Sequence, residues 1–123
     1  MDSDRVLLVE DDMIISLELH EFLQDSGFTV EAAYSGVGAL ASIGRNPPWA
    51  LVTDLDLGRG PDGFEVARCA RTARPGLPVV FISGTMAARF AREGVSGSGF
   101  VAKPFRGRQI VEALHRAIGP ALV

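Results

Sequence analysis

Short, continuous apolar runs alternate along the chain with longer segments of helical periodicity. The runs are rich in Val, Leu, Ile and Phe, as in strands that are buried on both faces of a parallel sheet. The longer segments carry apolar residues three to four positions apart, as on one face of a helix. The pattern predicts strands at 5–9, 28–34, 49–57, 77–83 and 99–102, and helices at 13–26, 36–43, 64–73, 85–93 and 110–118.

Capping residues and apolar faces define the helices further. Asp12 and Ser35 are suitable N-caps for the first two helices. The segment 85–93 predicts only a weak helix, because Met86 and Phe90 are its only bulky apolar residues. The inward face of the first helix is expected to hold Ile15, Leu19, Phe22 and Leu23, and that of the second Val37, Leu40 and Ala41.

Strands and helices alternate about five times, without an internal repeat or an interior linker. Such alternation predicts parallel strands joined by right-handed crossovers, with helices on both faces of the sheet. A chain of 123 residues is long enough for one domain with a substantial core. We therefore expect one α/β domain over 1–123, a doubly wound five-stranded parallel sheet whose core spans about 5–119.

Composition and charge narrow the classes of function. The formal net charge is −3 and the arginines are scattered among acids and small residues, so nothing indicates direct binding of nucleic acid. Cys69 is the only cysteine, which fits a reducing compartment. The N-terminus has no basic signal segment, and no apolar run approaches the roughly 20 residues that span a bilayer. These features predict a soluble, cytoplasmic protein without a membrane partner.

Polar residues follow four of the predicted strands. Glu10 and Asp11 follow the first strand, Asp54 ends the apolar run of the third, Ser83 ends the fourth, and Lys103 follows the fifth. In a parallel sheet these exits lie at one edge, where open α/β sheets bind ligands. Two like charges about 4 Å apart repel by roughly 4 kcal/mol at an effective dielectric of ~20, so clustered carboxylates need compensation. Lys103 supplies one positive charge, and Mg²⁺ is suited to supply the rest.

Four short motifs stand at these strand ends. They are Val-Glu-Asp-Asp at 9–12, Asp54 itself, Phe-Ile-Ser-Gly at 81–84 and Phe-Val-Ala-Lys-Pro-Phe at 100–105. In this order and spacing the chain resembles, over essentially its whole length, the CheY-like receiver domains of two-component response regulators. The resemblance implies a flavodoxin-like sheet with strand order 2-1-3-4-5. It also implies a phosphoacceptor signalling domain that assists only its own phosphorylation and dephosphorylation, not an enzyme.

The resemblance assigns the phosphoryl and metal chemistry to particular residues. Asp54 would accept a phosphoryl group from a phosphohistidine of a sensor histidine kinase or a histidine phosphotransfer protein. Glu10, Asp11, Asp54 and the backbone carbonyl of Asp56 would bind Mg²⁺. These roles agree with the chemistry of the residues, because a carboxylate can form an acyl phosphate and phosphoryl transfer depends on positioning and charge neutralisation.

The same resemblance implies how the site would act as a switch. Lys103 would pair first with Asp54 and then with the phosphoryl oxygens. Ser83 would hydrogen-bond the phosphate, and Phe100 would swing inward behind it. A cis peptide bond would precede Pro104, as in relatives.

Three features depart from the usual pattern of the family. Gly58 stands where relatives usually have proline, and the loop at 58–61 looks one residue longer. The segment 85–99 is short and rich in glycine in the region that usually transmits the signal, so its form and partners stay open. Phe100 lacks the hydroxyl of the commoner tyrosine, so any switch at this position works by packing alone.

Two other functions stay open at this point. One is a receiver-like protein-interaction module that is not phosphorylated, which the altered loop after Asp54 allows. The other is a haloacid-dehalogenase-like phosphatase, whose Asp-x-Asp motif resembles residues 54–56, although Glu112 is the only acid after Lys103. No DNA-binding output domain follows Val123, so we expect either a stand-alone regulator or a receiver from a larger protein. Its output would be an unidentified protein partner, and a homodimer is one open alternative for its assembly.

Overall fold

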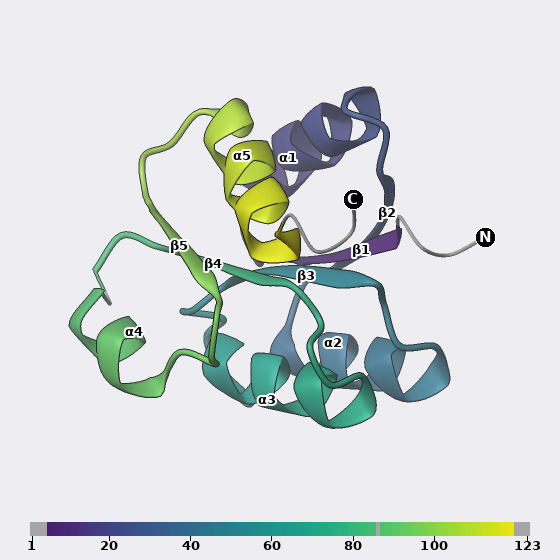
Figure 1. The fold of residues 1–123 in the computed structure, drawn as a ribbon, viewed down its shortest axis with the longest axis vertical. Coiled ribbons are helices and arrows are strands. Elements are labelled where there is room, and N and C mark those ends of the chain that lie inside the picture. Colours follow the sequence, from purple (N-terminus) through teal and green to yellow (C-terminus); the bar gives the residue numbers. More distant parts are fainter. Residues whose placement is uncertain (1–4, 86, 120–123) are drawn as a thin grey trace.

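The computed structural model describes residues 5–85 and 87–119, which form five strands and five helices in strict alternation (Figure 1). Met86, expected to give bulk to the fourth helix, lies outside the described residues. No helix in the described part of the chain is long and apolar enough to cross a bilayer. In chain order the elements are β1 (Arg5–Val9), α1 (Met13–Asp25), β2 (Thr29–Ala33), α2 (Gly36–Arg45), β3 (Ala50–Asp54), α3 (Gly63–Ala73), β4 (Val79–Ser83), α4 (Ala87–Glu93), β5 (Gly99–Ala102) and α5 (Gly107–Ile118).

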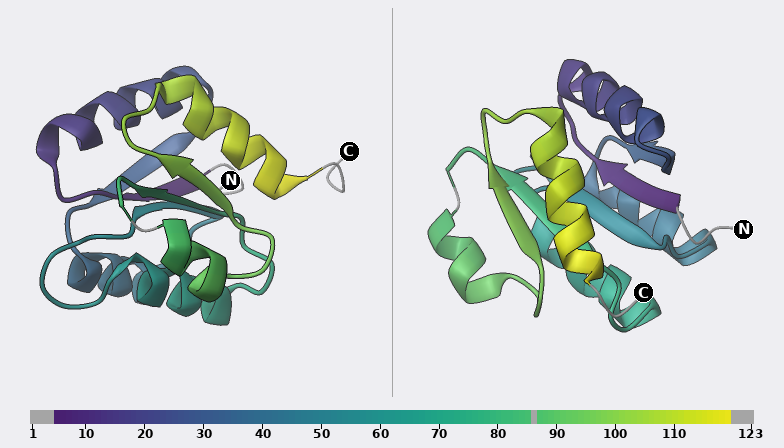
Figure 2. Two further views of the ribbon diagram at one scale, coloured as in Figure 1. Left: turned by 90° about the vertical axis from the view of Figure 1, so that its left-hand side faces the viewer. Right: turned by 45° about the horizontal axis from the view of Figure 1, so that its top comes forward.

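The five strands form one parallel sheet in the order β2-β1-β3-β4-β5. Helices α1 and α5 cover one face, and α2 and α3 cover the other (Figure 1). The short helix α4 lies near the edge strand β5 (Figure 2). The prediction of a doubly wound five-stranded parallel sheet with helices on both faces is therefore confirmed.

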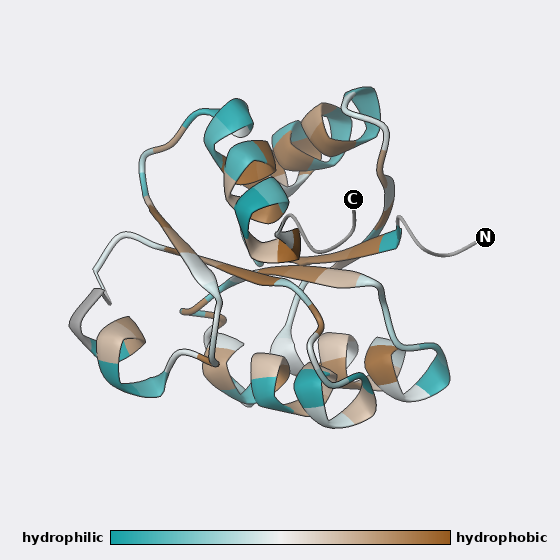
Figure 3. Ribbon diagram, in the orientation of Figure 1, coloured by the Kyte–Doolittle hydropathy of each residue, from teal (hydrophilic) through white to brown (hydrophobic). Residues whose placement is uncertain are grey.

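Two apolar cores, one on each face, enclose the sheet. Successive strand residues point to opposite faces, so one strand contributes to both cores. The strands are largely hydrophobic, whereas hydrophobic and hydrophilic residues alternate along the helices (Figure 3). In the central strands, the core under α2 and α3 holds Leu7, Val9, Leu51, Val79 and Phe81, and the core under α1 and α5 holds Val6, Leu8, Val52, Val80 and Ile82.

The observed strands differ from the predicted ones mainly at their ends, where they meet the loops. β2 covers Thr29–Ala33, one residue less at each end. β3 covers Ala50–Asp54 within the predicted 49–57 and ends at Asp54, as expected, and Leu57 is buried outside the strand as part of the core. β4 begins only at Val79, because Pro78 has no amide hydrogen to give to a sheet. The third strand therefore presents its last residue, an acid, at the sheet edge.

Helix α1 begins and packs largely as predicted. The side chain of Asp12 accepts hydrogen bonds from two amides of the first turn, which confirms it as the N-cap. Leu19 and Leu23 are buried, and Ile15 packs against them at the margin of the core. Phe22 was expected inside but is 39% exposed, because it lies at the border between α1 and the start of α5.

The predicted inward face of α2 is partly wrong. Val37 is 65% exposed and Ala41 is also exposed, whereas Leu40 is half-buried against the core. The buried face instead contains Ala39 and Ile43, together with small residues on the same side. The helix is rotated from the expected orientation because a segment rich in Gly and Ala has a weak apolar stripe, which several orientations satisfy.

Candidate functional site

The ends of four strands meet in one open cavity of about 680 Å³ at the carboxyl edge of the sheet. The strand register brings these ends together, because Val9 pairs with Thr53 and Ser83 pairs with Ala102. The order of the sheet also places β1 and β4 directly on either side of β3. The cavity is lined by Glu10, Asp11, Asp12, Asp54, Asp56, Gly58, Ser83, Gly84, Thr85 and Lys103.

Asp54 is the best-anchored carboxylate of this cavity. It is only 4% exposed, and its Oδ2 accepts a hydrogen bond of 2.8 Å from the Nζ of Lys103. Its Oδ1 accepts a hydrogen bond of 3.1 Å from the backbone amide of Asp56. Both oxygens therefore have fixed directions, and the ammonium partly compensates the buried charge.

Glu10 is the second buried acid and has fewer partners. Its side chain is fully buried, and its Oε2 accepts a hydrogen bond of 3.0 Å from the amide of Asp12. Its Oε1 lies 3.2 Å from the Nζ of Lys103, an ion-pair distance, but takes part in no hydrogen bond of good geometry. A buried carboxylate oxygen without a hydrogen bond is costly, so this atom is suited to a further cationic ligand.

The pKa values of Glu10 and Lys103 reflect the closeness of these charged groups. Burial raises the pKa of the Glu10 carboxyl from 4.5 to about 7; the charge of Asp54 adds to the shift, and the Asp12 amide and Lys103 oppose it. Burial alone would lower the pKa of the Lys103 ammonium. The hydrogen bond and charge of Asp54, together with Glu10, outweigh burial, so this pKa lies above its usual value. The cavity therefore favours added positive charge.

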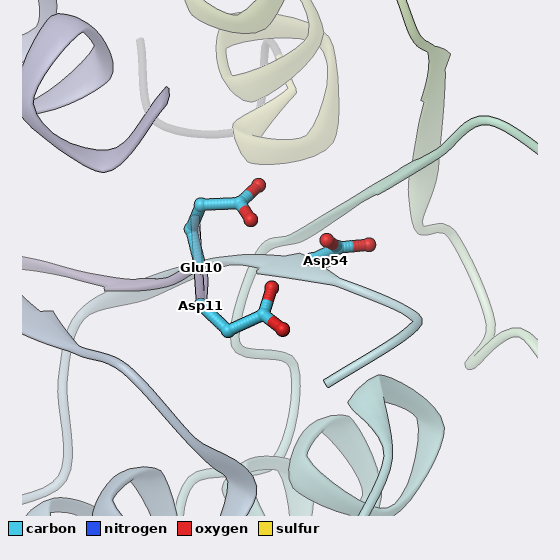
Figure 4. Close-up of side chains that lie close together, drawn as sticks. All are labelled: Glu10, Asp11 and Asp54. Atoms are coloured by element: carbon cyan, nitrogen blue, oxygen red, sulfur yellow. The ribbon is translucent and has the colours of Figure 1, made fainter. Parts of the chain in front are cut away.

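Three carboxylates converge as a candidate metal site. Figure 4 shows the side chains of Glu10, Asp11 and Asp54 directed toward a shared space beyond the ends of β1 and β3. Ligand oxygens from the three lie within 4.8 Å of one another. Glu10 and Asp54 are buried, while Asp11 is exposed at the rim. A set of three carboxylates with open access to water fits Mg²⁺, and the Oε1 of Glu10, which lacks a hydrogen bond, supports this fit.

The two predicted switch residues lie in different places. Ser83 is buried, lines the cavity, and its Oγ accepts a hydrogen bond of 3.1 Å from the amide of Thr85. Phe100 is half-buried and does not line the cavity; its ring centroid lies 5.0 Å from that of Phe90. The peptide bond between Lys103 and Pro104 is cis, as the family resemblance implies.

Sequence reasoning missed three contacts around this site. Thr85 and Asp12 hold Ser83 and Glu10 through their backbone amides, which a side-chain motif does not reveal. Arg89 of α4 contacts Asp62, the N-cap of α3, in a pairing of distant segments. The only available signal was local: Asp62 and Glu65 have the spacing of a capping box, which marks the start of α3.

Comparisons with known proteins agree with this geometry. The chain is 35% identical over 105 residues to Response regulator MprA of Mycobacterium ulcerans, covering 84% of this chain and 45% of the relative. It is 32% identical over 121 residues to the protein of the same name from Mycobacterium leprae, covering 94% and 53%. The chain thus spans about half the length of the curated relatives it matches.

Solved structures show the same architecture. A response regulator receiver protein from Sinorhizobium medicae WSM419 has a TM-score of 0.90 and 35% identity, with 94% of each chain covered. The chemotaxis protein CheY4 of Vibrio cholerae has a TM-score of 0.82 and 26% identity, covering 92% of this chain and 97% of the other. The family model described as the response regulator receiver domain matches residues 6–115. The chain therefore belongs to the response regulator receiver domain family of two-component systems.

Proposed function

We propose that Asp54 accepts a phosphoryl group from a phosphohistidine of a sensor histidine kinase or a histidine phosphotransfer protein. The observation that carries the proposal is the setting of Asp54, a buried carboxylate that bonds Lys103 at 2.8 Å and lies beside two other acids. A carboxylate oxygen forms the new P–O bond while the P–N bond to the imidazole breaks. The leaving nitrogen then takes a proton from solvent.

Glu10, Asp11, Asp54 and the backbone carbonyl of Asp56 would hold Mg²⁺ in this proposal. When bound, Mg²⁺ supplies positive charge that stabilises the equatorial oxygens of the transferring group. Lys103 supplies a further positive charge, because its ammonium already contacts the carboxylates of Asp54 and Glu10. After transfer, this ammonium can follow the negative charge onto the phosphoryl oxygens.

The same proposal assigns the response to Ser83 and Phe100. Ser83 lies at the cavity, where its hydroxyl can turn to donate to a phosphoryl oxygen. Such a turn would release the Thr85 amide and shift the loop toward Asp54. Phe100 would then repack, without any hydrogen bond of its own. The output is contact with a downstream protein in the cytoplasm, and a homodimer stays a prediction.

Phosphorylation by a small donor tests the proposal. The purified protein is incubated with Mg²⁺ and acetyl phosphate, and a single acid-stable, base-labile phosphate is sought by intact mass and peptide mapping. We expect it on Asp54, and we expect none in Asp54→Asn or with a chelator. Asp56→Asn is the matched control, because only the backbone of Asp56 is proposed to act and its side chain is exposed.

Other outcomes would contradict the proposal in different ways. Absence of an adduct with any phosphodonor would favour a receiver-like interaction module that is not phosphorylated. Rapid multiple turnover of unrelated phosphomonoesters would favour the phosphatase. Ser83→Ala should keep the phosphorylation but weaken the conformational response, measured by amide exchange; an unchanged response would remove Ser83 from the switch.

A further inference from the structure

Two neighbouring side chains attach α4 to the rest of the domain. The ring centroid of Phe90 lies 5.8 Å from that of Phe81 in β4 and 5.0 Å from that of Phe100 in β5. Arg89 contacts the start of α3, where its Nη2 lies 3.2 Å from the Oδ2 of Asp62. Phe90 therefore ties α4 to the sheet, whereas Arg89 ties it to the loop that follows the proposed phosphoacceptor.

The Arg89 contact has more than one component. The guanidinium carbon lies 4.8 Å from the centroid of the Phe64 ring, within the range of a cation–π interaction. Within α4, Arg89 also donates to both carboxylate oxygens of Glu93, at 2.8 and 3.1 Å. Glu93 thus orients the guanidinium from within α4. Asp62 and Phe64, at the start of α3, contact the same guanidinium.

The two oxygens of Asp62 have separate partners. Its Oδ1 accepts a hydrogen bond of 3.0 Å from the amide of Glu65 and so caps α3, while its Oδ2 accepts from Arg89. The next residue, Gly63, donates its amide to the carbonyl of Leu55, directly after Asp54. A short path of covalent and hydrogen bonds thus connects Asp54 to Arg89.

The cavity is also connected to α4 directly along the chain, through the residues that follow Ser83. Only residues 84–86 separate Ser83 from the first residue of α4. Because this connection is short, a shift of the 83–85 backbone toward Asp54 must also displace the start of the helix. The ion pair with Asp62 resists that displacement, since it holds Arg89 in the first turn of the same helix.

We propose that Arg89 is a latch that holds α4 on the loop after the phosphoacceptor, and that this latch opens when the phosphoryl group is bound. The inference rests on the proposed function. Binding equilibria are reciprocal: if a ligand at Asp54 opens the latch, then removing the latch must strengthen binding of that ligand. Loss of a partly exposed ion pair of this kind should change the affinity for the ligand at Asp54 by about two- to five-fold.

Binding of beryllofluoride, an anionic mimic of the phosphoryl group, measures this coupling at equilibrium. Its dissociation constant is determined by calorimetry in Mg²⁺ for wild type, Arg89→Gln and Asp62→Asn. Asparagine caps helices as well as aspartate does, so Asp62→Asn keeps the cap of α3 and removes only the partner of Arg89. We expect both variants to bind beryllofluoride about two- to five-fold more tightly than wild type.

The sign of the two effects separates the latch from general electrostatics. Arg89→Gln makes the chain more negative and Asp62→Asn makes it more positive, so a pure charge effect on an anion would move them in opposite directions. Glu21→Gln is the matched control, because it changes the charge as Asp62→Asn does while Glu21 lies exposed on α1, away from the contacts of Arg89. We expect the affinity of Glu21→Gln to be close to that of wild type.

The combined variant gives an independent check. Asp62→Asn with Arg89→Gln should bind no more tightly than the stronger single variant, because both substitutions remove one interaction. Unchanged or opposite affinities in the single variants would overturn the latch, as would full additivity in the combined variant. Failure of wild type itself to bind beryllofluoride or to be phosphorylated on Asp54 would instead overturn the proposed function.

Discussion

Replacing Glu10 by Gln should stabilise the metal-free protein, although it removes a residue of the proposed metal site. Glu10 is fully buried next to Asp54, and its Oε1 has no hydrogen bond. Glutamine has nearly the same shape and keeps an acceptor for the amide of Asp12. The substitution therefore removes a buried charge with little change in packing.

The size of the effect follows from the pKa of Glu10, which burial and the charge of Asp54 raise from 4.5 to about 7. One pKa unit corresponds to about 1.36 kcal/mol, so the charged form costs at most about 3–4 kcal/mol of folding free energy. The folded state binds this proton more tightly than the unfolded state does. Wild-type stability should therefore fall as the pH rises from 4.5 to about 7, and this loss should be complete above that range.

Urea unfolding at two pH values, followed by circular dichroism in the presence of a chelator, measures this effect. Near pH 8 we expect Glu10→Gln to be more stable than wild type by about 2–3 kcal/mol, and near pH 4.5 we expect little difference. Glu18→Gln, which removes an exposed carboxylate from α1, is the matched control and should change stability little at either pH. Equal gains at both pH values, or no gain at the higher one, would refute the reasoning. Added Mg²⁺ should reverse the order, because it stabilises the form that binds it.

Further substitutions test the packing around the site, each by urea unfolding. Gly36→Ala should cost about 1–3 kcal/mol, because its Cβ would lie 2.0 Å from the carbonyl oxygen of Pro61. Gly44→Ala in the same helix meets nothing within 4 Å and should instead gain about 0.5–1 kcal/mol; equal effects would contradict the close contact. Leu51→Ala, in the middle of the sheet, should cost about 2–5 kcal/mol, and a loss below about 1 would mean that the core can collapse around the space. Asp12→Ala should cost about 0.5–2 kcal/mol, and a neutral result would remove Asp12 as the cap of α1.

Much of the fold could be predicted from the sequence because its strands are buried on both faces. A strand of this kind has to be apolar throughout, so β1 and β5 were located to the residue. The acids, hydroxyl and amine at the strand ends could be placed at one edge because parallel strands share their direction. The prediction that Asp54, Lys103 and two further acids share one cavity is confirmed by the structure.

The orientation of α2 could not be predicted in the same way. Its Gly and Ala residues fit a core or a surface about equally well, so hydropathy does not fix which side is inside. The structure selects the side on which Gly36 allows the backbone of Pro61 to approach and on which Ser42 donates a hydrogen bond to Glu31. Both contacts join α2 to residues outside the helix. Val37, a larger apolar residue, is left exposed as a result.

The sequence by itself determined the order of the strands, their bounds to within a few residues, and which chemistry stands at their ends. These features are local, because burial on both faces and helix capping leave their pattern in neighbouring residues. Only the tertiary structure decided how far the proton affinity of Glu10 is raised, and that Arg89 meets Asp62 across 27 positions of chain. Both depend on distances between side chains of different elements, and such distances exist only after the elements have packed.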